Sequence, residues 1–101
     1  MIFRRDRFGD LVRRQLDLFA EDDAELVQEA EDAERAYDEA ERDEAEEAYG
    51  DYQLVLEAIA DRLGEIRDSY AATLDEDAAD EYERAFVHAA CKRYPKLTSE
   101  F

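Results

Sequence analysis

The side chains with the clearest potential for chemistry are carboxylates clustered in a stretch that reads as helix. Glu46, Glu47 and Glu57 could offer oxygen ligands to Ca²⁺, Mg²⁺ or iron. A di-iron site in a helical bundle also requires Glu-x-x-His motifs on facing helices. The single histidine is His88, and position 85 is alanine, so this motif is absent. We therefore expect diffuse attraction of cations, no metal site and no cofactor.

Nucleophilic side chains are equally isolated. Ser69 and Ser99 have no histidine and aspartate partners that the sequence indicates, and the surroundings of Cys91 are typical of an inert, half-buried thiol. The sequence contains no glycine-rich phosphate loop and no spacing of zinc ligands. It therefore predicts that the protein is not an enzyme. A single cysteine cannot form an internal disulfide, and this favours a cytoplasmic location.

Helical periodicity runs through most of the chain. Three glycines and one proline in 101 residues leave few turns, and apolar residues recur three and four positions apart. The first series is Phe8, Val12, Leu16, Phe19, Leu26, Ala30, Ala33, Tyr37 and Ala40. The second series is Ala45, Ala48, Tyr52, Val55, Ile59, Leu63, Ile66 and Tyr70. This spacing predicts two long helices whose apolar seams face each other.

A slip of register separates the two series and predicts a turn. The step from Ala40 to Ala45 is five residues, which breaks the heptad pattern and places the turn at 41–44. Asp43 would cap the second helix, and Glu46 would complete a capping box. Helices of about 32 and 29 residues would then pair along their full lengths.

A rival position for the turn is Gly50–Asp51, where glycine could end the first helix and aspartate could cap the second. That break would leave the seam at the end of the first helix uncovered. If Gly50 instead lies inside the second helix, it costs about 1 kcal/mol relative to alanine. A close approach of the two helices would explain that cost.

A third, shorter helix is predicted to begin near Thr73 or Asp75, either of which can serve as its N-cap. Pro95 stops this helix. On it, His88 is expected at the surface, flanked at four-residue spacing by two bases, Arg84 and Lys92.

The predicted fold is all-α. It is a long antiparallel helical hairpin with a shorter third helix packed on one end, which makes a three-helix bundle. Residues 1–94 form a single helical domain, and residues 95–101 are expected to be a short mobile tail. Residues 1–10 are basic but have no apolar stretch behind them, so we expect no secretory signal.

Acidic residues dominate the charge. Thirty acids against thirteen lysines and arginines give a net charge of −17, and residues 21–47 hold fifteen acids against two arginines. Five like-charged pairs four residues apart there cost roughly 1–2.5 kcal/mol, and two attractive pairs, Glu31–Arg35 and Asp38–Arg42, return less than half. The field disfavours direct binding of nucleic acid and anionic lipid. No run of 18 apolar residues is present, so no membrane span is predicted.

Two features predict an interaction surface. The seam at the far end of the hairpin is mostly alanine, which buries little apolar area and would need cover from a second copy or another protein. If Asp10 caps the first helix, Arg13 and Arg14 lie in its first turn, where the helix dipole disfavours cations. A second antiparallel copy, the third helix or an external anion could compensate. The predicted interaction residues are Phe3, Phe8, Arg4, Arg5, Arg13, Arg14, Ala30, Ala33, Tyr37 and Ala40.

The function that these features favour is a small cytoplasmic interaction or oligomerisation module, such as an adaptor or regulatory subunit, that binds another protein or itself as a homodimer or higher oligomer. One alternative is a nucleic-acid mimic that occupies the basic groove of a DNA-binding protein. A further alternative is a weak metal-binding accessory. A GC-rich genome or a salt-adapted cytoplasm would explain the acidity without any function.

Overall fold

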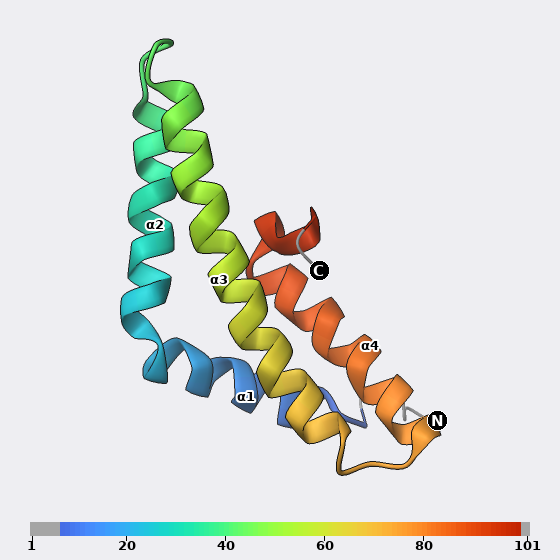
Figure 1. The fold of residues 1–101 in the computed structure, drawn as a ribbon. Coiled ribbons are helices and arrows are strands. Elements are labelled where there is room, and N and C mark those ends of the chain that lie inside the picture. The colour runs from blue at the N-terminus through green and yellow to red at the C-terminus, as the bar shows by residue number, and fades with distance from the viewer. Residues whose placement is uncertain (1–6, 100–101) are drawn as a thin grey trace.

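The computed structural model describes residues 7–99, and all of the regular structure in that range is helical. Four α-helices are followed by one 3₁₀ helix (Figure 1). Their bounds are α1 Gly9–Asp22, α2 Ala24–Glu39, α3 Ala45–Ala71, α4 Glu76–Arg93 and η2 Pro95–Ser99. The all-α prediction is confirmed. Within this part of the chain, no helix is both long enough and apolar enough to cross a membrane.

The prediction of three helices is wrong, because the expected first helix is two. Asp23 has φ −113° and ψ 39°, outside the helical region, and it separates α1 from α2. Acidic residues crowd the end of α1 and its last turn holds no base, an arrangement that the negative end of the helix dipole disfavours. The Asp23 carboxylate instead accepts a hydrogen bond from Arg62 Nε on α3 at 3.2 Å. The bend lets α1 cross the base while α2 runs along α3 (Figure 1).

The turn between the paired helices lies where the register slip predicts it. Helix α2 ends at Glu39 and α3 begins at Ala45, so the turn at 41–44 is confirmed. The proposed capping box is wrong, because Glu44 is the N-cap of α3 and no side chain bonds to the helix end. The rival break is also wrong, because Gly50 lies inside α3. A Cβ at Gly50 would meet nothing within 4 Å, so no close helix approach explains this glycine.

The hydrophobic core lies where α1, the part of α3 from Tyr52 onward, α4 and η2 meet. Helix α2 contributes no buried residue. The buried side chains are Phe8, Val12, Leu16, Phe19, Tyr52, Leu56, Ile59, Ala60, Leu63, Ala71, Ala78, Tyr82, Phe86, Ala90 and Leu97. The expected pairing of two helices of about equal length is therefore wrong, since the 16 residues of α2 lie along only part of the 27-residue α3.

Tyr82 is at the centre of this core. Its ring contacts Phe8, Tyr70 and Phe86, with centroids 5.6, 4.8 and 5.9 Å away. Its hydroxyl donates a hydrogen bond to Gln15 Oε1 at 2.7 Å, which satisfies the one polar group that the ring brings inside. Burial raises the pKa of Tyr82 above its ordinary value of 10.0, and the bond to Gln15 opposes part of that shift.

The two ends of α4 are fixed differently. Of the two proposed caps, Asp75 is the N-cap, and its carboxylate accepts a hydrogen bond from the Ala78 N–H at 2.9 Å. The Thr73 hydroxyl instead donates to the Tyr70 carbonyl at 2.7 Å. After α4 the chain turns into η2, and Leu97 of η2 is wholly buried. Packed structure thus continues past residue 94, where the sequence had suggested that the domain ends.

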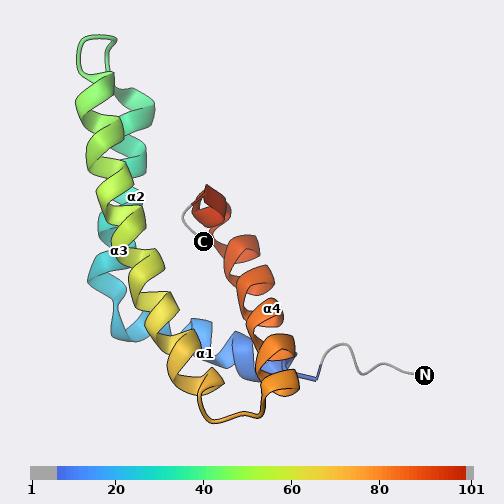
Figure 2. The ribbon, with the colours of Figure 1, turned by 45° about the vertical axis from the view of Figure 1, so that its right-hand side comes forward.

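The molecule is elongated, measuring 53 × 26 × 22 Å, and its upper part is a hairpin of only two helices. This hairpin rises from the base and ends in the turn between α2 and α3, well beyond η2 (Figure 2). We call residues 34–52 of this hairpin the arm. Tyr52, at 5% exposure, is its only buried residue.

Candidate interaction surface

The arm is held together by aromatic contacts. The Tyr37 ring lies 5.4 Å from the Tyr49 ring and is stacked at 6.4 Å on the Tyr52 ring, and these contacts join α2 to α3. The Gln53 amide donates a hydrogen bond to the Tyr49 hydroxyl at 2.6 Å. Tyr37 and Tyr49 nevertheless remain 38% and 47% exposed. These two tyrosines join the two helices, and a third to a half of each side chain stays exposed to another protein.

Tyr52 marks the lower limit of the arm. Burial raises its pKa above the ordinary value of 10.0, and the negative charge of Glu34 adds to the shift. Lys96 of η2 approaches Glu34 at 3.5 Å, so η2 reaches the hairpin at this level. Above it, α2 and α3 have only each other, among the residues that the structure describes.

The alanines predicted to interact lie along α2 in two different settings. Ala30 and Ala33 are half-buried and pack against the edge of the core. Ala40, just after α2, is half-buried at the start of the turn. The structure therefore places Ala30, Ala33 and Tyr37 on the packed side of α2, and none of the three is buried. Helix α2 consists of side chains that are all at least partly exposed.

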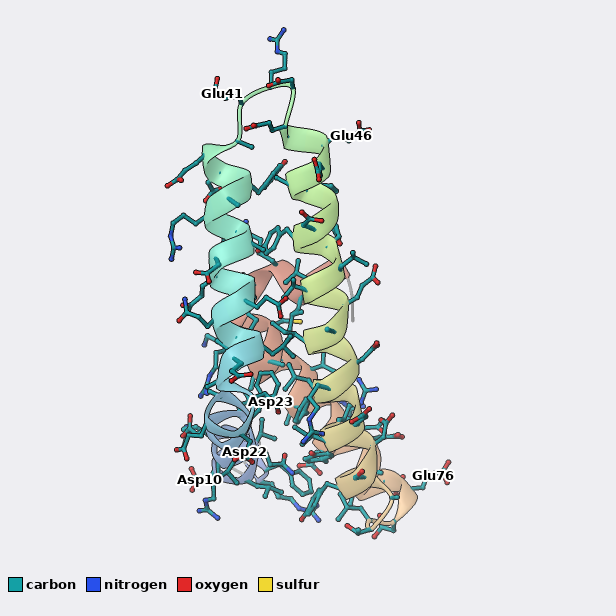
Figure 3. The ribbon with its side chains drawn as sticks, turned by 60° about the vertical axis from the view of Figure 1, so that its left-hand side comes forward. Asp10, Asp22, Asp23, Glu41, Glu46 and Glu76 are labelled. Carbon is teal, nitrogen blue, oxygen red and sulfur yellow. The ribbon has the colours of Figure 1, made fainter. Side chains whose placement is uncertain are left out.

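Few carboxylates of the hairpin have a cationic partner. The predicted pairs Glu31–Arg35 and Asp38–Arg42 are absent, and Arg35 instead bonds to Asp32 at 3.1 Å. Hydrogen bonds from Gln28 and then Arg35 lower the pKa of Asp32 below its ordinary value of 3.8. In the described chain the arm carboxylates without an ion pair are Asp38, Glu39, Glu41, Asp43, Glu44, Glu46, Glu47 and Asp51. Glu41 and Glu46 project outward at its tip (Figure 3).

Two of the three described arginines near the beginning of the chain, Arg7 and Arg13, have acidic partners within the chain. Arg13 pairs with Asp10 at 2.8 Å, and Arg7 pairs with Glu81 of α4 at 3.3 Å. Helix α4, which corresponds to the third predicted helix, thus supplies one of the acids that compensate these arginines. Arg14 is exposed and has no ion pair in the described range. Phe3, Arg4 and Arg5 lie outside the described residues.

Phe8, one of the predicted interaction residues, is buried in the core. It is 8% exposed and packs edge-on against Tyr82, while the Arg7 guanidinium lies 4.9 Å from the centre of its ring. Its side chain closes the lower end of the core. Any interaction that involves Phe8 must therefore use the edge of the core and not a protruding ring.

The residues with potential for chemistry are not brought together. Across residues 7–99, no group of three or more His, Cys, Asp or Glu side chains is placed to hold a metal ion. His88 is exposed on α4, Cys91 is half-buried there, and Ser69 is exposed on α3. Glu46, at the tip, is far along the hairpin from the base (Figure 3).

Sequence reasoning missed one feature of the base, a groove between α1 and α4. Its volume is about 800 Å³, and five of its lining residues are basic. The spacing of Arg84, His88 and Lys92 was a partial signal, because residues four apart share one face of a helix. Only the packing of α1 against α4 shows that this face borders a groove.

No protein-family model matches this chain, and no curated protein or solved structure is similar enough to it to count as a match. Only the chain's own residues and geometry therefore bear on its function.

Proposed function

We propose that the chain is a helical protein-interaction module that binds through its acidic arm and has no catalytic activity. The observation that carries this proposal is that the arm, residues 34–52, has one buried side chain, Tyr52, at its lower limit. Helical segments as short as those of the arm are marginal in water unless an apolar face is packed against something. A folded arm with so little core of its own gains stability when another surface covers it.

The chemistry of the arm supports binding to a protein surface. The half-exposed rings of Tyr37 and Tyr49 provide apolar area with a polar tip, and tyrosine is enriched at interfaces for this reason. The unpaired carboxylates around these rings provide negative charge that basic residues at the rim of a partner's binding site could complement. Such complementarity raises the association rate and the specificity of binding. Repulsion among these carboxylates would also fall when a cationic partner approaches.

A second candidate function is mimicry of nucleic acid. The observation that favours it is the outward projection of unpaired carboxylates from a narrow two-helix rod (Figure 3). Such a rod could occupy a basic DNA-binding groove. A partner that DNA displaces from the arm would support this function, and a partner with a neutral binding face would exclude it.

The test is hydrogen exchange of the arm amides at low protein concentration, with and without the fractionated lysate of the native cell. We expect the arm amides to exchange fast when the chain is alone and more slowly when a partner binds. A matched control is the base, whose core amides around Leu63 should not change. An isolated, dilute monomer whose arm amides are as protected as those of the base would contradict the proposal.

A further inference from the structure

The groove between α1 and α4 is rich in basic side chains. Its walls hold five basic residues, Arg13, Arg84, His88, Lys92 and Arg93, against one acid, Glu81. Its floor is apolar, because the buried side chains of Phe8, Val12 and Leu16 border it. In a protein with a net charge of −17, an apolar groove with basic walls is unusual enough to require a reason.

Some of these charges are already neutralised. Arg13 bonds to Asp10 at 2.8 Å, Arg93 bonds to Asp17 at 2.8 Å, and Glu81 bonds to Arg7 at 3.3 Å.

Two cations of the groove remain without an ion pair in the described structure, namely Arg84 and Lys92. They lie two helical turns apart on α4, about 12 Å at 1.5 Å per residue, with the exposed His88 between them. No described acid forms an ion pair with either base, although Asp68, Asp80 and Glu83 line a neighbouring hollow that Arg84 and His88 also line. The groove thus offers an apolar floor and free positive charge.

We propose that this groove is the docking site for the acidic arm of a second copy of this chain. The inference rests on the proposed function of the arm and names its partner. The arm supplies what the groove lacks, since it has unpaired carboxylates around half-exposed tyrosine rings. Opposite charges on the rims and apolar surface at the centre are the usual arrangement of a specific interface.

The shape of the molecule makes this contact intermolecular. The molecule is 53 Å long, and both ribbon views place the tip of the arm at the end away from α1 and the start of α4, the two helices that border the groove (Figures 1 and 2). An arm therefore cannot fold back into its own groove. If each of two copies places its arm in the groove of the other, both sites are filled and the dimer is closed.

The charge distribution predicts an unusual dependence on salt. At about 0.01 M salt the Debye length is roughly 30 Å, so the two net-negative bodies repel each other as wholes. At about 0.15 M it is roughly 8 Å, and only the local attraction of arm and groove remains. At about 1 M it is roughly 3 Å, and this attraction is screened as well. Self-association should be strongest at the intermediate concentration.

The experiment is sedimentation velocity at these three salt concentrations with wild type and two charge-reversed variants. The groove variant is Arg84→Glu with Lys92→Glu, and the arm variant is Glu41→Lys with Asp43→Lys. We expect the wild type to approach twice its 11.7 kDa mass at intermediate salt. Each variant alone should lose about tenfold or more in affinity, and an equimolar mixture of the two should regain it, because each then offers a complementary charge to the other.

A control isolates local contact from net charge. Glu57→Lys with Asp61→Lys changes the net charge as much as the arm variant does, on an exposed part of α3 outside both surfaces. It should leave the dimer intact. If the groove variant fails to fold by circular dichroism, Arg84→Gln with Lys92→Gln replaces it, and the same loss of affinity is expected.

The possible results separate this inference from the proposed function. A wild type that dimerises while the groove variant dimerises equally well overturns the groove assignment and leaves the arm as a binding surface. A wild type that is monomeric at every salt concentration also overturns it, and binding of a synthetic polyglutamate peptide to that monomer would assign the groove to a different acidic partner. Protected arm amides in that monomer would contradict the proposed function as well.

Discussion

Two glycines inside α3 allow the stability of the arm to be measured separately from that of the base. Gly50 lies in the arm and Gly64 lies beside Leu63, which is wholly buried in the core. Neither has a positive φ. A Cβ at Gly50 would meet nothing within 4 Å, and one at Gly64 would meet only an Arg67 guanidinium nitrogen at 3.6 Å, an ordinary contact. Both positions can therefore accept alanine without strain.

The two substitutions should stabilise the helix by about the same free energy, but that gain should be detected by different measurements. Glycine inside a helix costs about 0.5–1 kcal/mol relative to alanine. For Gly64→Ala, this gain belongs to the cooperative core and should raise Tm by about 2–8 °C in a domain of this size. For Gly50→Ala, we expect little change in Tm, because the arm has almost no core and opens before the base. The gain should instead slow hydrogen exchange of the arm amides by about 2–5-fold.

The assay combines thermal melting by circular dichroism with hydrogen exchange read by mass spectrometry. Both are performed on dilute protein, so that no second copy covers the arm. If Gly50→Ala raised Tm as much as Gly64→Ala, the arm would unfold together with the base, and its dependence on another surface would be refuted. If Gly50→Ala left arm exchange unchanged, the assignment of Gly50 to an exposed helix interior would be contradicted.

Three further predictions follow from the cap, the last helix and the tyrosines of the base. Asp75→Ala should lower the free energy of unfolding by about 1 kcal/mol in urea denaturation, while Thr73→Ala costs less; equal losses would contradict the assigned cap. Leu97→Ala should cost about 2–5 kcal/mol, because it leaves a cavity under η2, and a smaller loss would show that η2 does not close the core. Stability should fall as pH rises above about 10, because burial raises the folded-state pKa of Tyr52, Tyr82 and Tyr94, and a raised folded-state pKa contributes stability below the unfolded value that is lost as pH rises. A spectrophotometric titration should place the pKa values of the Tyr52, Tyr82 and Tyr94 phenols above the ordinary value.

Local patterns predicted the helices of this protein well and their ends less well. The register slip located the turn between α2 and α3, since apolar spacing must restart when a new helix begins. Acidic residues beside this turn made Asp43 a plausible cap, but the backbone placed Glu44 at that position without a side-chain bond. Many neighbouring residues could serve as caps in so acidic a stretch, and the sequence does not distinguish among them.

The break at Asp23 was not predicted because apolar spacing continues across it. Phe19 and Leu26 are seven residues apart, which fits an unbroken heptad. A continuous helix would be destabilised by the acids around Asp23, which have no base in the last turn of α1. The bend is stabilised because it lets α1 pack on α4. That stabilisation depends on a contact between distant parts of the chain.

The candidate site was predicted in part. The sequence singled out the acidic, alanine-rich hairpin and placed Tyr37 on its seam, and the structure shows that ring joining α2 to α3. It placed Phe8 among the predicted interaction residues, and the structure places it in the core. Apolar periodicity shows which face of a helix is apolar, but not which element covers that face.

The sequence by itself determined that the described chain is helical, that the helices turn at 41–44 and that the arm is anionic, because these properties depend on spacing and charge among near neighbours. Only the tertiary structure decided that the first helix bends at Asp23, that Leu97 enters the core and that Arg84 and Lys92 border a groove. Those outcomes depend on contacts between residues far apart in the chain, which helical periodicity does not encode.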